Sequence, residues 1–242
     1  MSLEISNMRS MNGTARIVGV LFIIGTVAGI LSSVFMKPIL GSPDYLIKFS
    51  ANQSQVLIGA LFVLIMAAAC ASIAIWLYPI LKNHSESLAL GAVGFRLIEG
   101  VFDIVAVISL ILLLTLSLEF VKAGAPDSSY FQTLGVLLLS GYNWIGNVPV
   151  LLSWCLGALM YYYIFYQTRL IPRWLSAWGL VGASLVIVAS LLVMFRFIDV
   201  WSTVQVVFNL PIALQEMVLA IWLIVKGFNP SAIASEPIRG KK

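Results

Sequence analysis

The sequence predicts an all-α, polytopic membrane protein built as a six-helix transmembrane bundle. Of its 242 residues, 61% are hydrophobic and only 10% are charged, whereas a soluble domain carries about 25% charged residues. Six stretches reach the length of about 20 mostly apolar residues that a membrane helix needs, and none alternates in polarity as a membrane β-strand does. This composition excludes a cytosolic enzyme, a secreted disulfide scaffold and a nucleic-acid-binding module, despite the basic isoelectric point of about 9.1.

Each predicted span is an apolar run with few or no charges. The first run has no charge after Arg16, and it exceeds the core of a signal peptide, which is about 7–15 residues long, so we interpret it as a retained span. The second run is uncharged, and the third is long and carries three charges. The predicted spans cover residues 15–35, 55–81, 88–116, 138–166, 175–195 and 206–225.

Lysine and arginine in the short loops predict the orientation, because they concentrate on the cytoplasmic side. An even number of spans places both termini on one side, where we count nine of these residues, against four on the other side. The nine are Arg9, Arg16, Lys82, Arg169, Arg173, Lys226, Arg239, Lys241 and Lys242, and the four are Lys37, Lys48, Lys122 and Arg196. We therefore expect a cytoplasmic segment 1–14, a six-span transmembrane domain 15–227 and a disordered cytoplasmic tail 228–242.

Four ionisable side chains fall at membrane depth, where each costs about 2.5–3.5 kcal/mol at a helix centre. Arg96, Glu99 and Asp103 share one face of the third span, because a helix turns by about 100° per residue; Glu216 lies at a similar depth in the sixth span. Burial favours the neutral form of a carboxyl group. We therefore expect Arg96 to pair with Glu99 or Glu216, and at least one carboxyl group to be protonated or to be paired with a cation or water.

Neutral polar residues accompany these charges. Pro149 and Pro211 each remove a backbone donor within a span and loosen the helix locally. The predicted binding site lies between spans three and six and comprises Arg96, Glu99, Asp103, Asn143, Asn147, Asn209, Gln215 and Glu216.

The motif inventory predicts no catalytic residue, no metal and no cofactor. The single histidine, His84, falls in a short loop, so neither a zinc site nor an intramembrane serine triad can be assembled. No G-x-S-x-G segment and no phosphate-binding loop occurs. Any catalysis would depend on carboxylates alone, and the sequence leaves enzymatic activity open.

Three functions fit these features. The first is binding or transport of a small polar or cationic molecule, an ion or a proton by the charged cluster. The second is a non-catalytic accessory or assembly protein whose cluster is structural, and the third is an intramembrane enzyme acting on a lipid-like substrate. The expected partners are the lipid bilayer and either a second copy of the chain or another membrane protein. Two faces of small residues, Gly25-x-x-x-Gly29 and Gly179-x-x-x-Ala183, allow helices to approach closely. They serve either dimerisation or, as we favour, packing within the chain.

Several segments carry a resemblance to a known family. They are Phe95-Arg96-Leu97-Ile98-Glu99, Leu170-Ile171-Pro172-Arg173, Leu214-Gln215-Glu216-Met217 and Trp222-Leu223-Ile224-Val225-Lys226-Gly227. Over about residues 12–230 the chain resembles the bacterial multi-pass membrane proteins of domain-of-unknown-function family 4386. The resemblance implies the fold and a bacterial cytoplasmic membrane location but no activity. Where the family pattern has a histidine in the fourth span, this chain has Asn143, Asn147 and Trp154.

Overall fold

The computed structural model describes residues 2–125 and 129–229, and all regular secondary structure in these ranges is α-helical. The helices are α1 (Ser2–Leu40), α2 (Tyr45–Ala51), α3 (Gln53–Leu81), α4 (Glu86–Lys122), α5 (Ser129–Asn147), α6 (Pro149–Thr168), α7 (Arg173–Met194) and α8 (Thr203–Val225). They provide six segments long and apolar enough to cross a membrane, with α5 and α6 together forming one of them. The predicted all-α, six-span architecture is confirmed. The side of the membrane that the termini face stays a prediction.

The helices extend beyond the predicted spans on the side that joins α1 to α3 and α4 to α5. Helix α1 continues to Leu40 and α4 to Lys122, so the segments that we expected to be loops are partly helical. The short helix α2 occupies part of the first of these segments, and it buries Leu46 and Phe49. These two residues are three apart and therefore share one face of α2, which packs against α4.

The fourth span is divided at Val148, where α5 ends and α6 begins. Pro149 occupies the first turn of α6, a position where a missing backbone donor costs nothing. One carbonyl near the end of α5 is satisfied locally, because the side-chain amide of Asn147 donates to the oxygen of Asn143 at 2.8 Å. The other predicted loosening is not a break: Pro211 lies inside a continuous α8.

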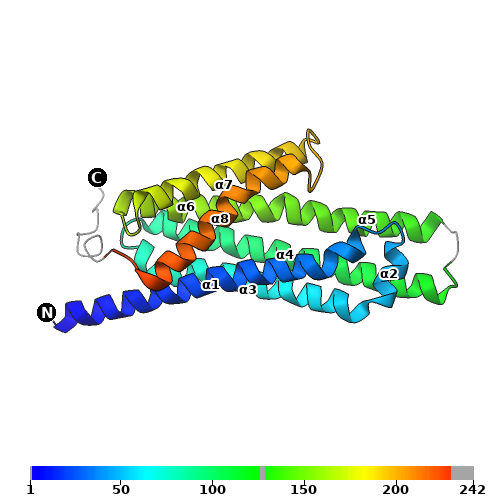
Figure 1. The fold of residues 1–242 in the computed structure, drawn as a ribbon, viewed down its shortest axis with the longest axis horizontal. Coiled ribbons are helices and arrows are strands. Elements are labelled where there is room, and N and C mark those ends of the chain that lie inside the picture. Colours follow the sequence, from blue (N-terminus) through cyan, green and yellow to red (C-terminus); the bar gives the residue numbers. More distant parts are fainter. Residues whose placement is uncertain (1, 126–128, 230–242) are drawn as a thin grey trace.

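The membrane-spanning helices form a closed ring in the order α1, α3, α4, α6, α7, α8 and back to α1. Helix α1 begins and α8 ends at the same end of the bundle, which we call the closed end (Figure 1). The α1–α8 contact there is close, since a Cβ atom at Gly19 would lie 2.7 Å from the carbonyl oxygen of Ala220. We call the opposite end, with α2 and the α4–α5 and α7–α8 turns, the open end.

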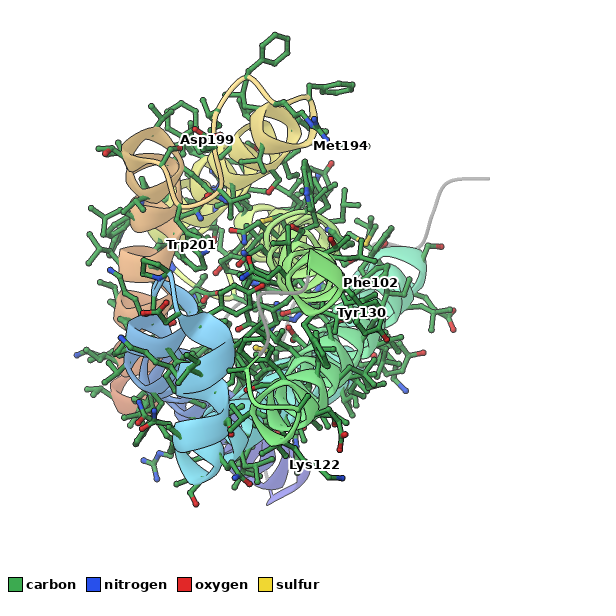
Figure 2. All side chains as sticks on the ribbon, turned by 90° about the vertical axis from the view of Figure 1, so that its right-hand side faces the viewer. Phe102, Lys122, Tyr130, Met194, Asp199 and Trp201 are labelled. Carbon is green, nitrogen blue, oxygen red and sulfur yellow. The ribbon has the colours of Figure 1, made fainter. Side chains whose placement is uncertain are left out.

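Two hydrophobic cores lie along the bundle. The core of the closed end draws buried residues from all six ring helices. The core of the open end is built from α1, α2, α3, α4 and α5, and neither α7 nor α8 contributes to it. In Figure 2, which views the open end, Met194, Asp199 and Trp201 of the α7–α8 turn lie far from Lys122. The bundle is therefore closed at one end and forked at the other.

The small-residue faces pack within the chain, as we favoured. A Cβ atom at Gly179 would lie 2.7 Å from the Tyr162 ring of α6. A Cβ atom at Gly29 would lie 3.0 Å from the sulfur of Met66 in α3. Both faces therefore allow neighbouring helices to approach closely.

The two ends of the chain differ from the predicted division in their helical extent. Helix α1 already begins at Ser2, within the segment that we assigned to residues 1–14. Phe228, which we assigned to the tail, is buried and packs near Phe165 with ring centroids 6.0 Å apart. The rest of the predicted disordered tail, residues 230–242, lies outside the described residues.

Candidate functional site

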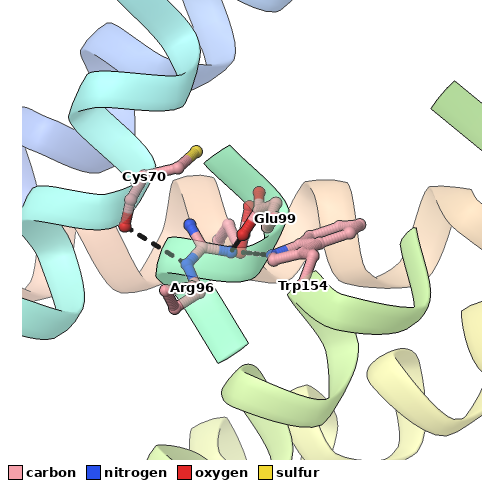
Figure 3. Close-up of polar contacts among 5 residues, drawn as sticks. Cys70, Arg96, Glu99 and Trp154 are labelled. Carbon is pink, nitrogen blue, oxygen red and sulfur yellow. Dashed lines mark hydrogen bonds and ion pairs between the residues drawn. The ribbon is translucent and has the colours of Figure 1, made fainter. Parts of the chain in front are cut away.

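A buried ion pair lies at the centre of the bundle on α4. Arg96, Glu99 and Asp103 are only 1%, 4% and 3% exposed, so the predicted face does point into the protein. The guanidinium Nη1 of Arg96 lies 2.9 Å from Oε2 of Glu99, which confirms one of the two expected pairings. Arg96 Nε also donates to the carbonyl oxygen of Cys70 in α3 at 3.2 Å. The pair is thus fixed between two helices (Figure 3).

Helix α6 makes room for this arginine and supplies a partner for the remaining glutamate. A Cβ atom at Gly157 would lie 3.1 Å from Cγ of Arg96, so glycine allows the arginine stem to pass. The indole Nε1 of Trp154 donates to Oε1 of Glu216 at 3.3 Å. Glu216 therefore bonds to a neutral donor, and the arginine pairs with the glutamate of its own helix.

A cavity of about 780 Å³ lies between this cluster and the open end. Asp103, Asn143 and Asn147 from the predicted site line it, together with the aromatic side chains of Tyr142 and Trp154. Most of the other lining side chains are apolar or small and come from α1, α3 and α8. The cavity lies where the bundle forks.

The rim of the cavity is exposed. Ile30 and Val34 of α1 line the cavity and are 58% and 62% exposed. Trp201, in the turn before α8, also lines it and is 66% exposed. The cavity therefore reaches the surface of the bundle between α1 and the α7–α8 hairpin, on a side that faces lipid if the six helices span a bilayer.

Asp103 is the only acidic side chain on the cavity wall among the residues that the structure describes. Its Oδ2 atom is buried and has no hydrogen-bond partner within the described chain. A buried carboxylate oxygen without a partner is costly. Because Asp103 lines the cavity, a ligand in the cavity would meet this carboxyl group.

The remaining predicted residues divide between the fork and the closed end. Asn147 accepts a hydrogen bond from the side-chain amide of Gln205 at 2.9 Å, which joins the start of α8 to the end of α5. Gln215 is fully buried away from the cavity, since it accepts from the hydroxyl of Tyr162 at 2.6 Å and donates to the carbonyl oxygen of Leu175 at 3.1 Å.

Asn209 is half-buried with an unpartnered Oδ1 atom and does not line the cavity. Arg96, Glu99 and Glu216 lie behind the wall rather than on it.

Three residues of the site were missed by the sequence reasoning. Trp154 and Tyr142 line the cavity, but aromatic residues in spans are common, and nothing in their spacing separates a cavity wall from the protein core. Gln205 had a usable signal, because it is a polar residue just before the sixth predicted span, three positions after the capping serine Ser202.

No metal site accompanies the cavity. Within residues 2–125 and 129–229, no group of three or more histidine, cysteine, aspartate or glutamate side chains is arranged to hold a metal ion. The two cysteines, Cys70 and Cys155, are free thiols in the bundle interior. The chemistry available at the cavity is that of one carboxylate, two amides, three aromatic side chains, one exposed lysine and the hydroxyl groups of threonine and serine.

The fold and the cavity together define a helical bundle with six helices able to cross a membrane and, at its fork, a mostly apolar pocket that contains a few polar groups. The family model described as "Domain of unknown function (DUF4386)" matches residues 17–227, so the chain belongs to this family. Comparison with curated proteins gives no match, and comparison with solved structures gives none either.

Proposed function

We propose that this protein binds, within the membrane, a small amphiphilic molecule whose head group is cationic and is held by Asp103. The observation that carries the proposal is Asp103 itself, which lines a large cavity and has a buried carboxylate oxygen without a hydrogen-bond partner among the described residues. The volume of about 780 Å³ falls within the range of small-molecule sites, about 300–1,000 Å³. A mostly apolar lining with a few polar groups is also typical of such sites.

The charges around the cavity favour a cationic head group. The Arg96–Glu99 pair is internally neutral, and Glu216 accepts from Trp154, whereas Oδ2 of Asp103 has no hydrogen-bond partner among the described residues. Lys37 also lines the cavity, but it is exposed at the rim, whereas Asp103 is buried. A bound cation would neutralise Asp103 without moving the pair. The rings of Tyr142 and Trp154 in the same wall would add cation–π attraction.

The exposed rim supports an amphiphile rather than a fully polar ion. Ile30 and Val34 border the opening, and such side chains favour contact with the apolar part of a molecule that arrives through the bilayer. The apolar body would lie along α1 while the head group reaches Asp103.

Transport of the same molecule is a second candidate function. The break at Val148 lies in the cavity wall region, since Asn147 and Val150 on either side of it line the cavity. Discontinuous helices at membrane depth are a feature of transporter binding sites. Release of a bound probe across a liposome membrane would separate transport from binding alone.

The test is binding of the lipophilic cation tetraphenylphosphonium to the purified full-length protein by equilibrium dialysis. We expect the unchanged protein to bind the probe and Asp103→Asn to bind it at least tenfold more weakly, because a desolvated charge pair is lost. The matched control is Asp199→Asn, which removes the same charge from an exposed position at the open end and should leave binding unchanged. Equal binding by the two variants, or no binding by the unchanged protein, would contradict the proposal.

A further inference from the structure

A second, basic pocket lies at the closed end, remote from Asp103. Its volume is about 510 Å³, and it is formed by the α6–α7 turn and the end of α8. Three cationic side chains line it, those of Arg169, Arg173 and Lys226. We propose that this pocket binds the phosphate of an anionic phospholipid headgroup. The site is independent of the function proposed above.

The three cations have no anionic partner among the residues that the structure describes. Within the part of the chain that the structure describes, no acidic side chain forms an ion pair with any of them, and none lines the pocket. Arg173 is oriented by α6, since its Nε donates to the carbonyl oxygen of Tyr166 at 3.4 Å and its guanidinium lies 5.4 Å from the Tyr166 ring centroid. The terminal nitrogens of this side chain remain for an external acceptor.

The backbone at Arg169 places this side chain at the end of α6. The residue has a φ of 59°, in the left-handed region, where glycine is the usual residue because an L side chain is disfavoured. The same φ occurs at Arg196, so the backbone conformation is not specific to the pocket. What is specific to the pocket is the convergence of three cationic side chains.

The position and lining of the pocket favour a lipid over a free anion. The pocket lies at the ends of three membrane-spanning helices, the level at which headgroups are found. Beside the cations, its wall contains the partly exposed side chains of Pro172 and Trp222, which free phosphate cannot use but which the glycerol and first acyl carbons of a lipid can contact. Basic pockets between spans are typical sites for anionic headgroups. Two segments that carry the family resemblance, 170–173 and 222–227, meet here.

The test measures the thermal unfolding midpoint of the full-length protein in detergent micelles containing phosphatidylcholine. Phosphatidylglycerol is titrated in one series and inorganic phosphate in another. We expect phosphatidylglycerol to raise the midpoint in a saturable manner, because it binds only the folded state, and inorganic phosphate at the same concentrations to have no effect. Arg169→Gly and Lys226→Gln should each weaken the apparent affinity about fivefold, and Arg169→Lys should retain it.

The chain offers a matched control in Arg196. This residue is also an exposed arginine with a φ of 59°, but it lies at the open end. Arg196→Gly therefore removes the same charge and relaxes the same backbone conformation, and it should leave the phosphatidylglycerol titration unchanged. Equal losses for Arg169→Gly and Arg196→Gly would show attraction to overall charge and would overturn the site. Stabilisation by inorganic phosphate would overturn the lipid assignment, as would the absence of any phosphatidylglycerol effect.

Discussion

At the closed end all six ring helices share one core, whereas at the open end α7 and α8 separate from the core formed by α1 to α5. The difference follows from side-chain size along α1 and α8. At Gly19 the absence of a side chain lets the backbone of α8 approach α1. Further along, Ile30 and Val34 of α1 are exposed, and α8 contributes no residue to the core of this end.

The comparison shows how a single bundle can hold both a rigid charge pair and an accessible carboxylate. Arg96 and Glu99 lie on the closed side of the fork, where α3 and α6 enclose them. Asp103 lies four residues further along the same helix and meets the cavity instead. One turn of α4 therefore separates a structural pair from a candidate ligand-binding group.

The largest expected effect comes from breaking the buried pair of the closed end. Arg96→Met leaves Glu99 buried without its cation, so we expect the free energy of unfolding to fall by about 3–5 kcal/mol. Unfolding in mixed micelles with increasing dodecyl sulfate would measure the change. The double variant Arg96→Met/Glu99→Gln should recover most of the loss, because neither partner is then charged. If Arg96→Met were as stable as the unchanged protein, the Arg96–Glu99 pair would not stabilise the bundle.

Glycine substitutions compare the two ends directly and should give an intermediate effect. Gly19→Ala places a methyl group against the backbone of α8 at the closed end, and we expect a loss of about 1–3 kcal/mol. Gly146 is helical, lines the cavity and has no atom within 4 Å of a built Cβ. Gly146→Ala should therefore be neutral or stabilising by about 0.5–1 kcal/mol, as alanine favours helix more than glycine does. Equal losses in the same unfolding assay would remove the distinction between the ends.

The smallest expected effect concerns the hydrogen bond between Gln205 and Asn147, which joins α8 to α5 at the fork. Gln205→Ala removes the hydrogen bond to Asn147 and the one that Gln205 accepts from the backbone N–H of Trp201, each of which should contribute about 1 kcal/mol. The consequence should be local, with faster hydrogen exchange at the first turns of α8 and unchanged exchange at the closed end. Thr203→Ala, an exposed change in the same turn, is the control. Uniformly faster exchange along the whole bundle would mean that the two ends are not independent.

Hydropathy was sufficient to predict the six spans, but it could not predict their lengths at the open end. Residues 129–137, before the predicted start of the fourth span, include Gln132 and Thr133 and are helical because their apolar side packs on the α4 core. Such a helix extends beyond its uniformly apolar part, and a hydropathy window ends too early. The break at Val148 was foreseen only as loosening near Pro149, since a proline in a span can equally lie inside a continuous helix, as Pro211 does.

Helical periodicity was sufficient for residues on one helix and insufficient between helices. It placed Arg96, Glu99 and Asp103 on one face, and all three are buried. Gln215 and Glu216 are adjacent and therefore point about 100° apart, yet both accept hydrogen bonds from α6, one from Tyr162 and the other from Trp154. Which helix each of them meets depends on the order of helices around the ring, and no single span encodes that order.

The contact between α1 and α8 also affects how the protein is made. Helix α1 leaves the ribosome well before α8 does, yet Gly19 must pack against Ala220. A nascent chain that stops before residue 203 lacks α8, and therefore exposes Gly19 of α1 to lipid or to other membrane proteins. It also lacks Glu216, so the indole of Trp154 has no acceptor. The final helix thus completes the assembly, and a truncated chain is an incomplete bundle rather than a smaller one.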